Sequence, residues 1–405
     1  MKIAIVTSLF PPYQGANAWR PYLVSREMNS NGHSVEVFTT NITSGRPSTS
    51  CNATIHDGIE VNRLSPFTLK AWEWFASRRI FLNYLKRMWP DTQLIWMILT
   101  ACHLRKIKGE ITVLAYINPV SMLLLPCFLH SRRFHFVFDY LESVTPFRLQ
   151  VPYEMTPHRQ LAKFLRKLEK YSLSRAKRAV FTSSENRNEY VSLGLCPYEK
   201  TIYIPHYSDS NAFAVADLPF SAELVITYVG YFNRDRSPKA FLEGLRKLLQ
   251  REPESETKIR VNIYGNGLGV YSNIVDELGL QNVVNDCGFV DRERVSEITA
   301  FSHVLLLVTS PQHKLFFPSK VVEYIVARRP ILALLSPESE VVSLLKESGR
   351  DQWICSYDNP DQVADCLSRL YQLHEAGELT KILPEYQYVL TNQYTPTWEK
   401  VFEVE

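Results

Sequence analysis

The stretch "FPSKVVEYI" (317–325) places a basic and an acidic residue three positions apart, where a helix is expected to start. Proline and serine, here Pro318 and Ser319, are favoured at helix starts, serine as the N-cap. The first turn of a helix offers unpaired N–H groups and a positive dipole end, which stabilise a phosphate. Lys320 would add a cation there, and Glu323 would lie on the same face, where it could accept hydrogen bonds from a diol such as ribose. An ordinary capped helix with a Lys–Glu surface pair is the alternative interpretation.

A second candidate contact is the glycine-rich stretch "IYGNGLGVY" (263–271), which follows a strand-like run and precedes a helical pattern. Gly265 and Gly267 lack a side chain, so the backbone there can approach a ligand closely. The dinucleotide fingerprint G-x-G-x-x-G is not met, because Val270 stands where the third glycine is required. The loop is therefore interpreted as either a nucleotide contact or a tight turn without a ligand.

Basic residues follow another strand-like run, in the stretch "VGYFNRDRSPKAF" (229–241). The run ends at Gly230, and Arg234 and Arg236 come in the loop that leads to the next helix. Guanidinium groups at the carboxyl end of a strand suit an anionic ligand, although loop arginines are also commonly solvated. Because Lys320 would lie at the same sheet, two basic loops favour a diphosphate as the ligand.

Two stretches of the first half also have a functional and a structural interpretation. The loop "PPYQGANAW" (11–19) carries Gly15 just before a helical pattern, so it is either a turn or a loop whose backbone nears the substrate. Residues 71–98 interleave aromatic and basic side chains. This pattern fits a segment that lies against anionic lipid, and it equally fits helices packed on a sheet with snorkelling basic side chains.

Composition argues against several classes of protein. The chain has 405 residues and a formal net charge of +3, so no global charge favours nucleic acid as a partner. Its seven cysteines are odd in number and include no C-x-x-C pair, which argues against a zinc site and a disulfide framework. No Asp-rich, G-x-S-x-G, H-E-x-x-H or P-loop motif is present, so we expect no metal, no cofactor and no common hydrolase mechanism.

The protein is expected to be cytoplasmic. Its opening residues, "MKIAIVTSLFPP", contain a short apolar run that predicts a first β-strand rather than a signal peptide. The longest apolar runs, "LIWMILTAC" and "VSMLLLPCFL", fall well short of the roughly 20 residues of a membrane span. Contact with the inner face of the cell membrane would therefore be peripheral, through 71–98.

Short apolar runs alternate with longer helical patterns along the chain, which is typical of βαβ units and a parallel sheet. Helical spacing is clearest in 159–175, and a helix is also expected over 119–130. Strands are expected at 2–7, 34–39, 111–116, 134–139, 178–183, 201–206, 224–230, 258–265, 282–286, 303–309, 330–335 and 353–357.

The length fits two domains of roughly 200 residues each. We place one doubly wound α/β domain at 1–206, a polar linker at 207–223 and a second such domain at 224–385, with 386–405 packing back toward the first. Ligands of such sheets bind beyond the carboxyl ends of the strands, near the topological switch point. With two of these sheets face to face, the ligand is expected in the cleft between them.

Taken together, these stretches resemble the GT-B glycosyltransferases, specifically family 4 of the retaining enzymes. The resemblance covers nearly the whole chain and lies in the order and spacing of motifs that are weak singly. It is carried by "MKIAIVTSLFPPYQGANAW", "SREMNSNGHSVEVFTT", "LEKYSLSRAKRAVFTSSENRNEY", "TYVGYFNRDRSPKAFLEGLRKLL", "IYGNG", "VNDCGFVDRERVSEITAFSHVLLL" and "FPSKVVEYIVARRPILALL". The fold it implies is GT-B, with two Rossmann-like doubly wound domains facing across a cleft.

The resemblance implies transfer of a sugar, with retention, from a nucleotide-diphosphate sugar to a saccharide or lipid-linked saccharide, in the synthesis of cell-surface polysaccharide or glycoconjugate. Lys320 and Arg236 would be the catalytic cations that hold the diphosphate, and Glu323 would bind the ribose hydroxyls. The acceptor would bind the first domain, near Asn118 and Asp139. The remaining donor contacts would be Gly15, Gly230, Gly265, Gly267, Phe317, Pro318 and Ser319.

Two positions depart from the family pattern. Many members carry a second carboxylate eight positions before the ribose-binding one, and here that position is Leu315, which leaves the donor sugar open. Some members place a histidine in the N-terminal domain, and Asn118 occupies that neighbourhood. Two alternatives therefore remain: a sugar-nucleotide 2-epimerase of the same fold, and a non-catalytic protein that binds nucleotide sugars.

Overall fold

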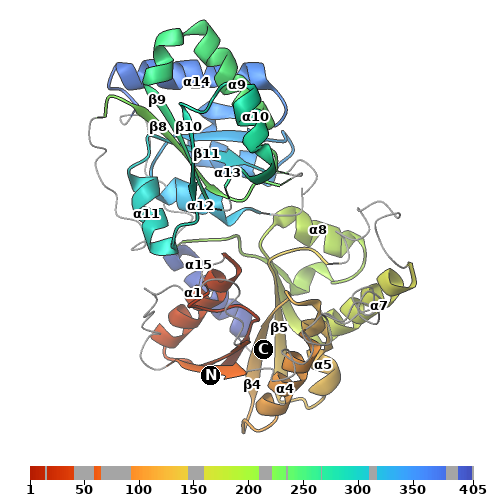
Figure 1. The fold of residues 1–405 in the computed structure, drawn as a ribbon. Helices are drawn as coiled ribbons and strands as arrows, with labels where there is room; N and C mark the ends of the chain where they lie inside the picture. The colour runs from red at the N-terminus through yellow and green to blue at the C-terminus, as the bar shows by residue number, and fades with distance from the viewer. Residues whose placement is uncertain are drawn as a thin grey trace, which may run out of the picture. The chain divides into compact units, whose positions relative to one another are not determined.

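The chain forms two compact units in the computed structural model (Figure 1). One unit comprises Met1–Pro205 together with Tyr394–Glu405, and the other comprises His206–Gln393. The structure describes residues 1–13, 16–40, 59–64, 93–144, 159–208, 221–233, 236–265, 267–309, 317–379 and 391–403. Predictions on Gly15, Arg234, Leu315 and most of 71–98 fall outside these ranges and stay predictions.

The first unit is built on a sheet of seven parallel strands in the order β3-β2-β1-β4-β5-β6-β7. The strands are β1 (Lys2–Val6), β2 (Ser34–Thr40), β3 (Glu60–Leu64), β4 (Ile111–Tyr116), β5 (Phe134–Tyr140), β6 (Ala176–Phe181) and β7 (Thr201–Tyr203). All six residues of β4 are buried, as expected of a central strand that is covered on both faces. β3 was not predicted, because its sequence EVNRL is largely polar and it pairs only at the edge of the sheet.

The helices of this unit are α1 (Ala16–Ser30), α4 (Leu94–Leu104), α5 (Leu125–Phe128), α7 (Arg159–Arg175), α8 (Ser184–Ser192) and most of α15 (Thr391–Phe402). The bounds of α7 agree with the helix expected at 159–175. The helix expected over 119–130 is instead a 3₁₀ turn, Val120–Leu124, followed by the short α5. Pro126 accounts for the break, because a proline nitrogen cannot donate the hydrogen bond that a continuous helix needs.

Helix α15 packs in the first unit although the whole second unit precedes it in the sequence. Trp398 is buried and stacks with Phe402 at a ring-centre distance of 5.8 Å. The Arg20 guanidinium carbon lies 5.3 Å from the centre of the Trp398 ring. On the next residue, Glu399 Oε2 lies 3.0 Å from His33 Nε2. Apolar, cation–π and polar contacts therefore all hold α15 in place.

The second unit contains a sheet of six parallel strands in the order β10-β9-β8-β11-β12-β13. The strands are β8 (Leu224–Gly230), β9 (Ile259–Gly265), β10 (Val284–Gly288), β11 (Val304–Val308), β12 (Ile331–Leu335) and β13 (Ile354–Ser356). In each unit the chain starts at an inner strand, fills one side of the sheet and then returns to fill the other. Both sheets are thus doubly wound and parallel, which confirms the predicted α/β fold class.

The helices of the second unit are α9 (Lys239–Arg251), α10 (Ser272–Glu277), α11 (Arg292–Ala300), α12 (Ser319–Val326), α13 (Glu340–Glu347) and α14 (Pro360–Glu375). Helices α9 and α14 pack closely against each other. A Cβ added at Gly244 of α9 would lie only 2.6 Å from Val363 Cγ1 of α14. Within the described residues, neither unit has a helix with the length and apolarity to cross a membrane.

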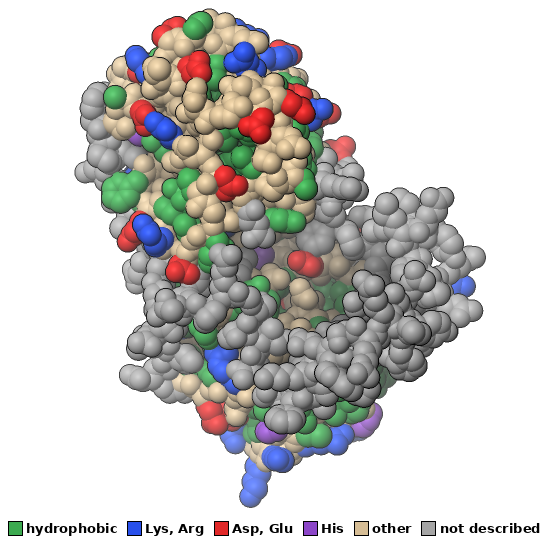
Figure 2. All heavy atoms as spheres, viewed as in Figure 1, with side chains coloured by type: hydrophobic (Ala, Val, Ile, Leu, Met, Phe, Trp, Pro, Cys, Tyr) green, Lys and Arg blue, Asp and Glu red, His purple; other side chains and the backbone are tan. Residues whose placement is uncertain are grey.

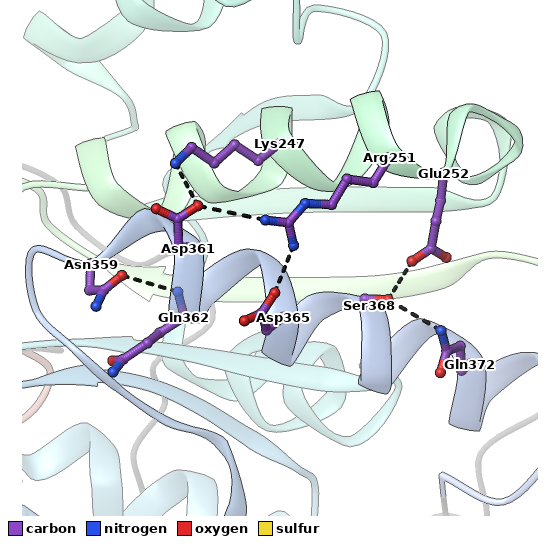
Figure 3. Close-up of polar contacts among 9 residues, drawn as sticks. All are labelled: Lys247, Arg251, Glu252, Asn359, Asp361, Gln362, Asp365, Ser368 and Gln372. Atoms are coloured by element: carbon purple, nitrogen blue, oxygen red, sulfur yellow. Dashed lines mark hydrogen bonds and ion pairs between the residues drawn. The ribbon is translucent and has the colours of Figure 1, made fainter.

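Ion pairs follow the exposed side of the α9–α14 contact (Figure 3). Lys247 Nζ lies 2.7 Å from Asp361 Oδ1, and Arg251 Nη1 lies 2.6 Å from Asp365 Oδ1. These side chains are 40% to 68% exposed, so solvent screens their attraction and each pair contributes little to stability. The apolar contact around Gly244 therefore holds the two helices together.

Candidate active site

The second sheet has its topological switch point between β8 and β11, from which the strand order runs in opposite directions. In an open parallel sheet, ligands bind beyond the carboxyl ends of the strands at such a point. Gly230 ends β8, Gly265 ends the neighbouring β9, and α12 begins at Ser319 after β11. Gly230, Gly265 and the start of α12 thus lie at the edge of the second sheet that favours a ligand.

Gly230 and Gly265 are paired across β8 and β9. A Cβ added at Gly265 would lie 1.9 Å from the Gly230 carbonyl oxygen, and Gly265 has a φ of +122°. Both space and conformation therefore demand glycine at this position. The backbones of β8 and β9 thus approach each other closely at the carboxyl edge, and neither of these two residues projects a side chain from it.

Gly267 lies in contact with Asp286 of the neighbouring strand β10, and this contact leaves no space for a side chain. Its φ is +70°, and a Cβ there would lie 2.3 Å from Asp286 Oδ2. The Asp286 carboxylate accepts hydrogen bonds from the N–H groups of Leu268 and Gly288, over 3.0 and 3.2 Å. Asp286 thereby fixes the glycine loop after β9 through hydrogen bonds within the protein.

Helix α12 begins without a side-chain cap. Pro318 precedes the first turn with an extended backbone (φ −72°, ψ 121°), and Ser319 is already helical instead of being the N-cap. Proline suits the cap position through its fixed φ but has no side-chain oxygen to accept from the first N–H groups. The Phe317 ring is buried against α12, so Phe317 offers a ligand only its backbone. This helix start therefore fits an anion.

Lys320 and Glu323 lie one turn apart on α12 and form an ion pair, with 2.6 Å between Lys320 Nζ and Glu323 Oε2. Their burial is unequal, because the Lys320 side chain is 28% exposed and that of Glu323 only 5%. The pair is thus not the solvated surface pair of the structural interpretation. A buried carboxylate needs a compensating charge, so Lys320 stabilises Glu323 while its ammonium group stays within reach of solvent.

Tyr324 connects α12 to the end of β8. Its hydroxyl accepts a hydrogen bond from the Val229 N–H over 3.1 Å, one residue before Gly230. Burial raises the pKa of Tyr324 above its ordinary range, with a further contribution from nearby Tyr228 and Glu323. The hydroxyl therefore stays protonated and fixes the start of α12 against the switch point.

Arg236 is held close to β8 by the loop that follows the strand. The backbone N–H of Arg236 donates to Asn233 Oδ1 over 2.8 Å, and the two residues form an isolated β-bridge. Burial raises the pKa of Tyr228 to about 12, and the adjacent Arg236 guanidinium opposes that rise. Arg236 Nε is buried, and within the described residues it has no hydrogen-bond partner. The Arg236 guanidinium thus lies beside Tyr228 near the end of β8, where a cation suits a phosphate oxygen.

In the first unit, Asn118 lies at the corresponding switch point between β1 and β4. Asn118 is exposed, and its carbonyl accepts a hydrogen bond from Ser8 Oγ over 2.8 Å. The Ser8 carbonyl in turn accepts from Thr40 Oγ1 over 2.7 Å. These two hydrogen bonds connect the segments that follow β1 and β4 with the last residue of β2. Asn118 therefore has a fixed position at the carboxyl edge of the first sheet.

Asp139 has a different position from the one expected. It is fully buried in β5, where Arg20 Nε donates to its Oδ2 over 2.7 Å. Burial raises the pKa of Asp139, and Arg20 offsets part of that rise. Arg20 also donates to the carbonyls of Ile204 and Pro205. The carboxylate therefore anchors α1 and the segment after β7 inside the unit and is not presented to an acceptor.

Sequence reasoning missed three residues that organise these edges. Tyr324 belongs to the apolar face of α12, and nothing in its spacing indicates that the hydroxyl meets β8. Arg20 meets Asp139 across 119 positions of sequence, which no local pattern reveals. Asp286 could have been noticed, because it is a carboxylate near the end of a strand beside a glycine-rich loop.

No cluster of three or more metal-ligating side chains occurs within the described ranges, whose six cysteines are free thiols. The positive charge identified at the carboxyl edge of the second sheet comes from Lys320, Arg236 and the start of α12.

The second unit is also where the sequence matches a family model. Residues 223–373 match the model described as "Glycosyl transferases group 1". This match covers the second unit, which is therefore similar to the group 1 glycosyltransferases. The matched region includes both strand-end glycines, Arg236 and the Lys320–Glu323 pair, so the residues of the candidate site fall within the family's own domain.

Solved structures extend the similarity in fold to the whole chain. Sucrose-phosphate synthase from Thermosynechococcus elongatus is 15% identical, with a TM-score of 0.67 and 99% of each chain covered. HepE from Anabaena, solved with UDP-glucose, is 13% identical, with a TM-score of 0.64 and 99% of each chain covered. A glycosyltransferase from Rickettsia africae is 12% identical, with a TM-score of 0.65 over 100% of this chain and 99% of its own. These structures share the GT-B fold with the chain. The sequence has no significant match among curated proteins.

Proposed function

We propose that this protein is a glycosyltransferase that moves a sugar from a nucleotide-diphosphate sugar to a saccharide or lipid-linked saccharide, with retention, in the synthesis of cell-surface polysaccharide or glycoconjugate. The second unit binds the donor and the first binds the acceptor, near Asn118. The observation that carries the proposal is the Lys320–Glu323 pair at the uncapped start of α12, beside the switch point. The UDP-glucose bound by HepE supports a donor of this class.

In this proposal the donor diphosphate lies against the first turn of α12. Lys320 and Arg236 provide the charge that balances it, and the N–H groups around Ser319 donate to its oxygens. When Lys320 turns to the phosphate, the Glu323 carboxylate is left to accept hydrogen bonds from the ribose hydroxyls. Gly230 and Gly265 place no side chain of their own between the nucleotide and this edge of the sheet.

The reaction follows from where charge develops. The bond between the anomeric carbon and the phosphate oxygen breaks, and its electron pair stays on the departing nucleoside diphosphate. The acceptor oxygen bonds to the anomeric carbon on the same face, and its proton passes to the departing phosphate. Lys320 and Arg236 face the charge that grows on the diphosphate, so they stabilise the transition state more than the bound donor.

The proposal is tested first by ligand binding. A ligand that binds only the folded protein raises the melting temperature by mass action, so UDP and GDP sugars are screened by thermal shift. We expect stabilisation by one class of nucleotide sugar and by its free diphosphate, and loss of that shift in Arg236→Ala. Absence of a shift with every nucleotide sugar would contradict donor binding.

Product analysis then separates transfer from the two alternative functions. The stabilising nucleotide sugar is incubated with and without a panel of saccharide acceptors, and the products are analysed by mass spectrometry and NMR. An acceptor-dependent glycoside with a retained anomeric configuration supports the proposal. A 2-epimer formed without acceptor would indicate the epimerase, and binding without turnover across the panel would indicate a non-catalytic protein.

A further inference from the structure

Helix α7 of the first unit turns a strongly basic face outward. The exposed side chains between residues 163 and 175 are Lys163, Phe164, Arg166, Lys167, Lys170, Tyr171, Ser174 and Arg175. This set contains five cations and no anion. Phe164 and Tyr171 are 51% and 42% exposed and stand seven positions apart, so both rings point to the same side of the helix as the cations.

The opposite face of α7 fixes the helix to its unit. Leu165, Leu168 and Leu173 are buried in the core. The acid of the segment, Glu169, is buried too, and its Oε1 accepts a hydrogen bond from the Tyr190 hydroxyl over 2.7 Å. The helix therefore cannot rotate to bury its aromatic rings, and Glu169 is engaged away from the outer cations.

The surface continues beyond the end of α7. Lys200 Nζ donates to the carbonyls of Ser174 and Ala176 over 3.1 and 2.9 Å, which brings the 3₁₀ turn Tyr198–Lys200 beside the helix. Tyr198 is 59% exposed. Together with Phe164 and Tyr171, it accounts for the large exposed rings that the structure describes in the first unit. Apolar and basic groups are thus concentrated on one surface, and Glu199 is the exposed acid of the adjoining turn.

The exposed cations of α7 differ in their surroundings from those of the second unit. None of the five forms an ion pair with a carboxylate in the part of the chain that the structure describes. The second unit differs, because basic and acidic side chains lie next to each other over its visible surface (Figure 2) and pair between α9 and α14. In Figure 1, α7 lies at the outer flank of its own unit.

We infer that the exposed face of α7, with Tyr198, binds the anionic surface of a lipid bilayer. Cations attract the phosphate headgroups, and aromatic rings on the same face enter the boundary between headgroups and acyl chains. Double-stranded nucleic acid would contact the cations through its phosphates and would leave the exposed rings without a partner, whereas an anionic bilayer engages both. This surface contains none of the residues assigned to sugar transfer, so the inference stands apart from the proposed function.

The inference is tested by co-sedimentation of the full chain with vesicles of phosphatidylcholine and phosphatidylglycerol. We expect binding at low salt that weakens as salt rises, and no binding to pure phosphatidylcholine. The triple variant Lys163→Gln/Lys167→Gln/Lys170→Gln should bind roughly a hundred-fold more weakly, because each cation lost near an anionic surface weakens binding roughly five-fold. Glutamine is a good helix former, so α7 should stay folded.

A matched control removes three lysines elsewhere, in Lys106→Gln/Lys108→Gln/Lys346→Gln. These lysines are exposed, so the variant has the same change in net charge and should keep binding. Phe164→Ser/Tyr171→Ser should weaken vesicle binding while the salt dependence is kept. The inference would be overturned if the wild type fails to bind anionic vesicles at low salt, or if the control loses as much binding as the α7 variant. Preferential binding to a double-stranded oligonucleotide, with no vesicle binding, would also overturn it.

Discussion

The Tyr324 hydroxyl accepts the hydrogen bond of the Val229 N–H over 3.1 Å, so the helix that carries Lys320 is fastened to the strand that ends at the switch point. In Tyr324→Phe the Val229 N–H is left buried without a partner, which costs about 1–3 kcal/mol of stability. We expect a lower melting temperature and weaker binding of the nucleoside diphosphate.

The control for this variant is Tyr198→Phe, which removes a hydroxyl from a largely exposed side chain of the first unit and should change neither property. An unchanged melting temperature and unchanged diphosphate affinity in Tyr324→Phe would show that this hydrogen bond does not position α12.

The Lys320–Glu323 pair allows a structural role to be separated from a catalytic one. Lys320→Ala should lower turnover by roughly a hundred-fold or more, because one preorganised electrostatic contact to the leaving group is lost. It should also destabilise the fold, since Glu323 is left as an uncompensated buried charge. The double variant Lys320→Met/Glu323→Gln should regain stability and remain inactive. Turnover close to wild type in either variant would refute the assignment of Lys320.

His303 should make the stability of the second unit depend on pH. Its Nδ1 accepts a hydrogen bond from the Val225 N–H over 3.0 Å, and burial, with His374 and Arg329 nearby, lowers its pKa from 6.5 to about 4. Between these two values the unfolded chain binds a proton that the folded chain does not. The stabilisation is therefore complete above pH 6.5 and is lost as pH falls toward 4, by up to about 1.4 kcal/mol per pH unit.

As pH is lowered through this range, the melting temperature should fall less steeply for His303→Gln than for the wild type. His130→Gln, at an exposed position, is the control and should keep the wild-type slope. Equal slopes in the wild type and His303→Gln would mean that His303 does not stay neutral in the folded unit.

Trp398 should stabilise the first unit and not the second. Trp398→Ala removes a large buried ring from α15, which typically costs about 3–5 kcal/mol. Hydrogen exchange resolves the two units, which a single melting curve does not. We expect faster exchange in α1 and β1 with unchanged protection in β8 and β11, whereas Lys400→Ala, exposed on the same helix, should leave both unchanged. Equal loss of protection in both units would contradict this division.

The parallel sheets could be predicted because their central strands are uninterrupted apolar runs. ITVLAY in β4 and ILALL in β12 are buried throughout and have no solvent-facing polar positions. β3 could not be predicted in this way, because it is a largely polar strand at an edge.

The same distinction applies to the candidate site. The side-by-side placement of Lys320 and Glu323 follows from helical spacing, so their contact could be predicted locally. Their unequal burial depends on how α12 packs against the rest of the unit, and the spacing of residues in the sequence does not reveal that packing. Asp139, which was expected on the acceptor side, illustrates the limit more strongly. Its partner Arg20 comes from a distant part of the sequence and holds the carboxylate inside the unit.

The docking of α15 has a consequence for how the protein is made. The first unit uses Tyr394–Glu405, which the ribosome adds only after the entire second unit. During translation the nascent first unit therefore exposes the surface that Trp398 later covers. Chaperones can bind this surface until α15 has been synthesised. A stall or premature stop in the second unit would release a first unit that is already synthesised but still unfinished.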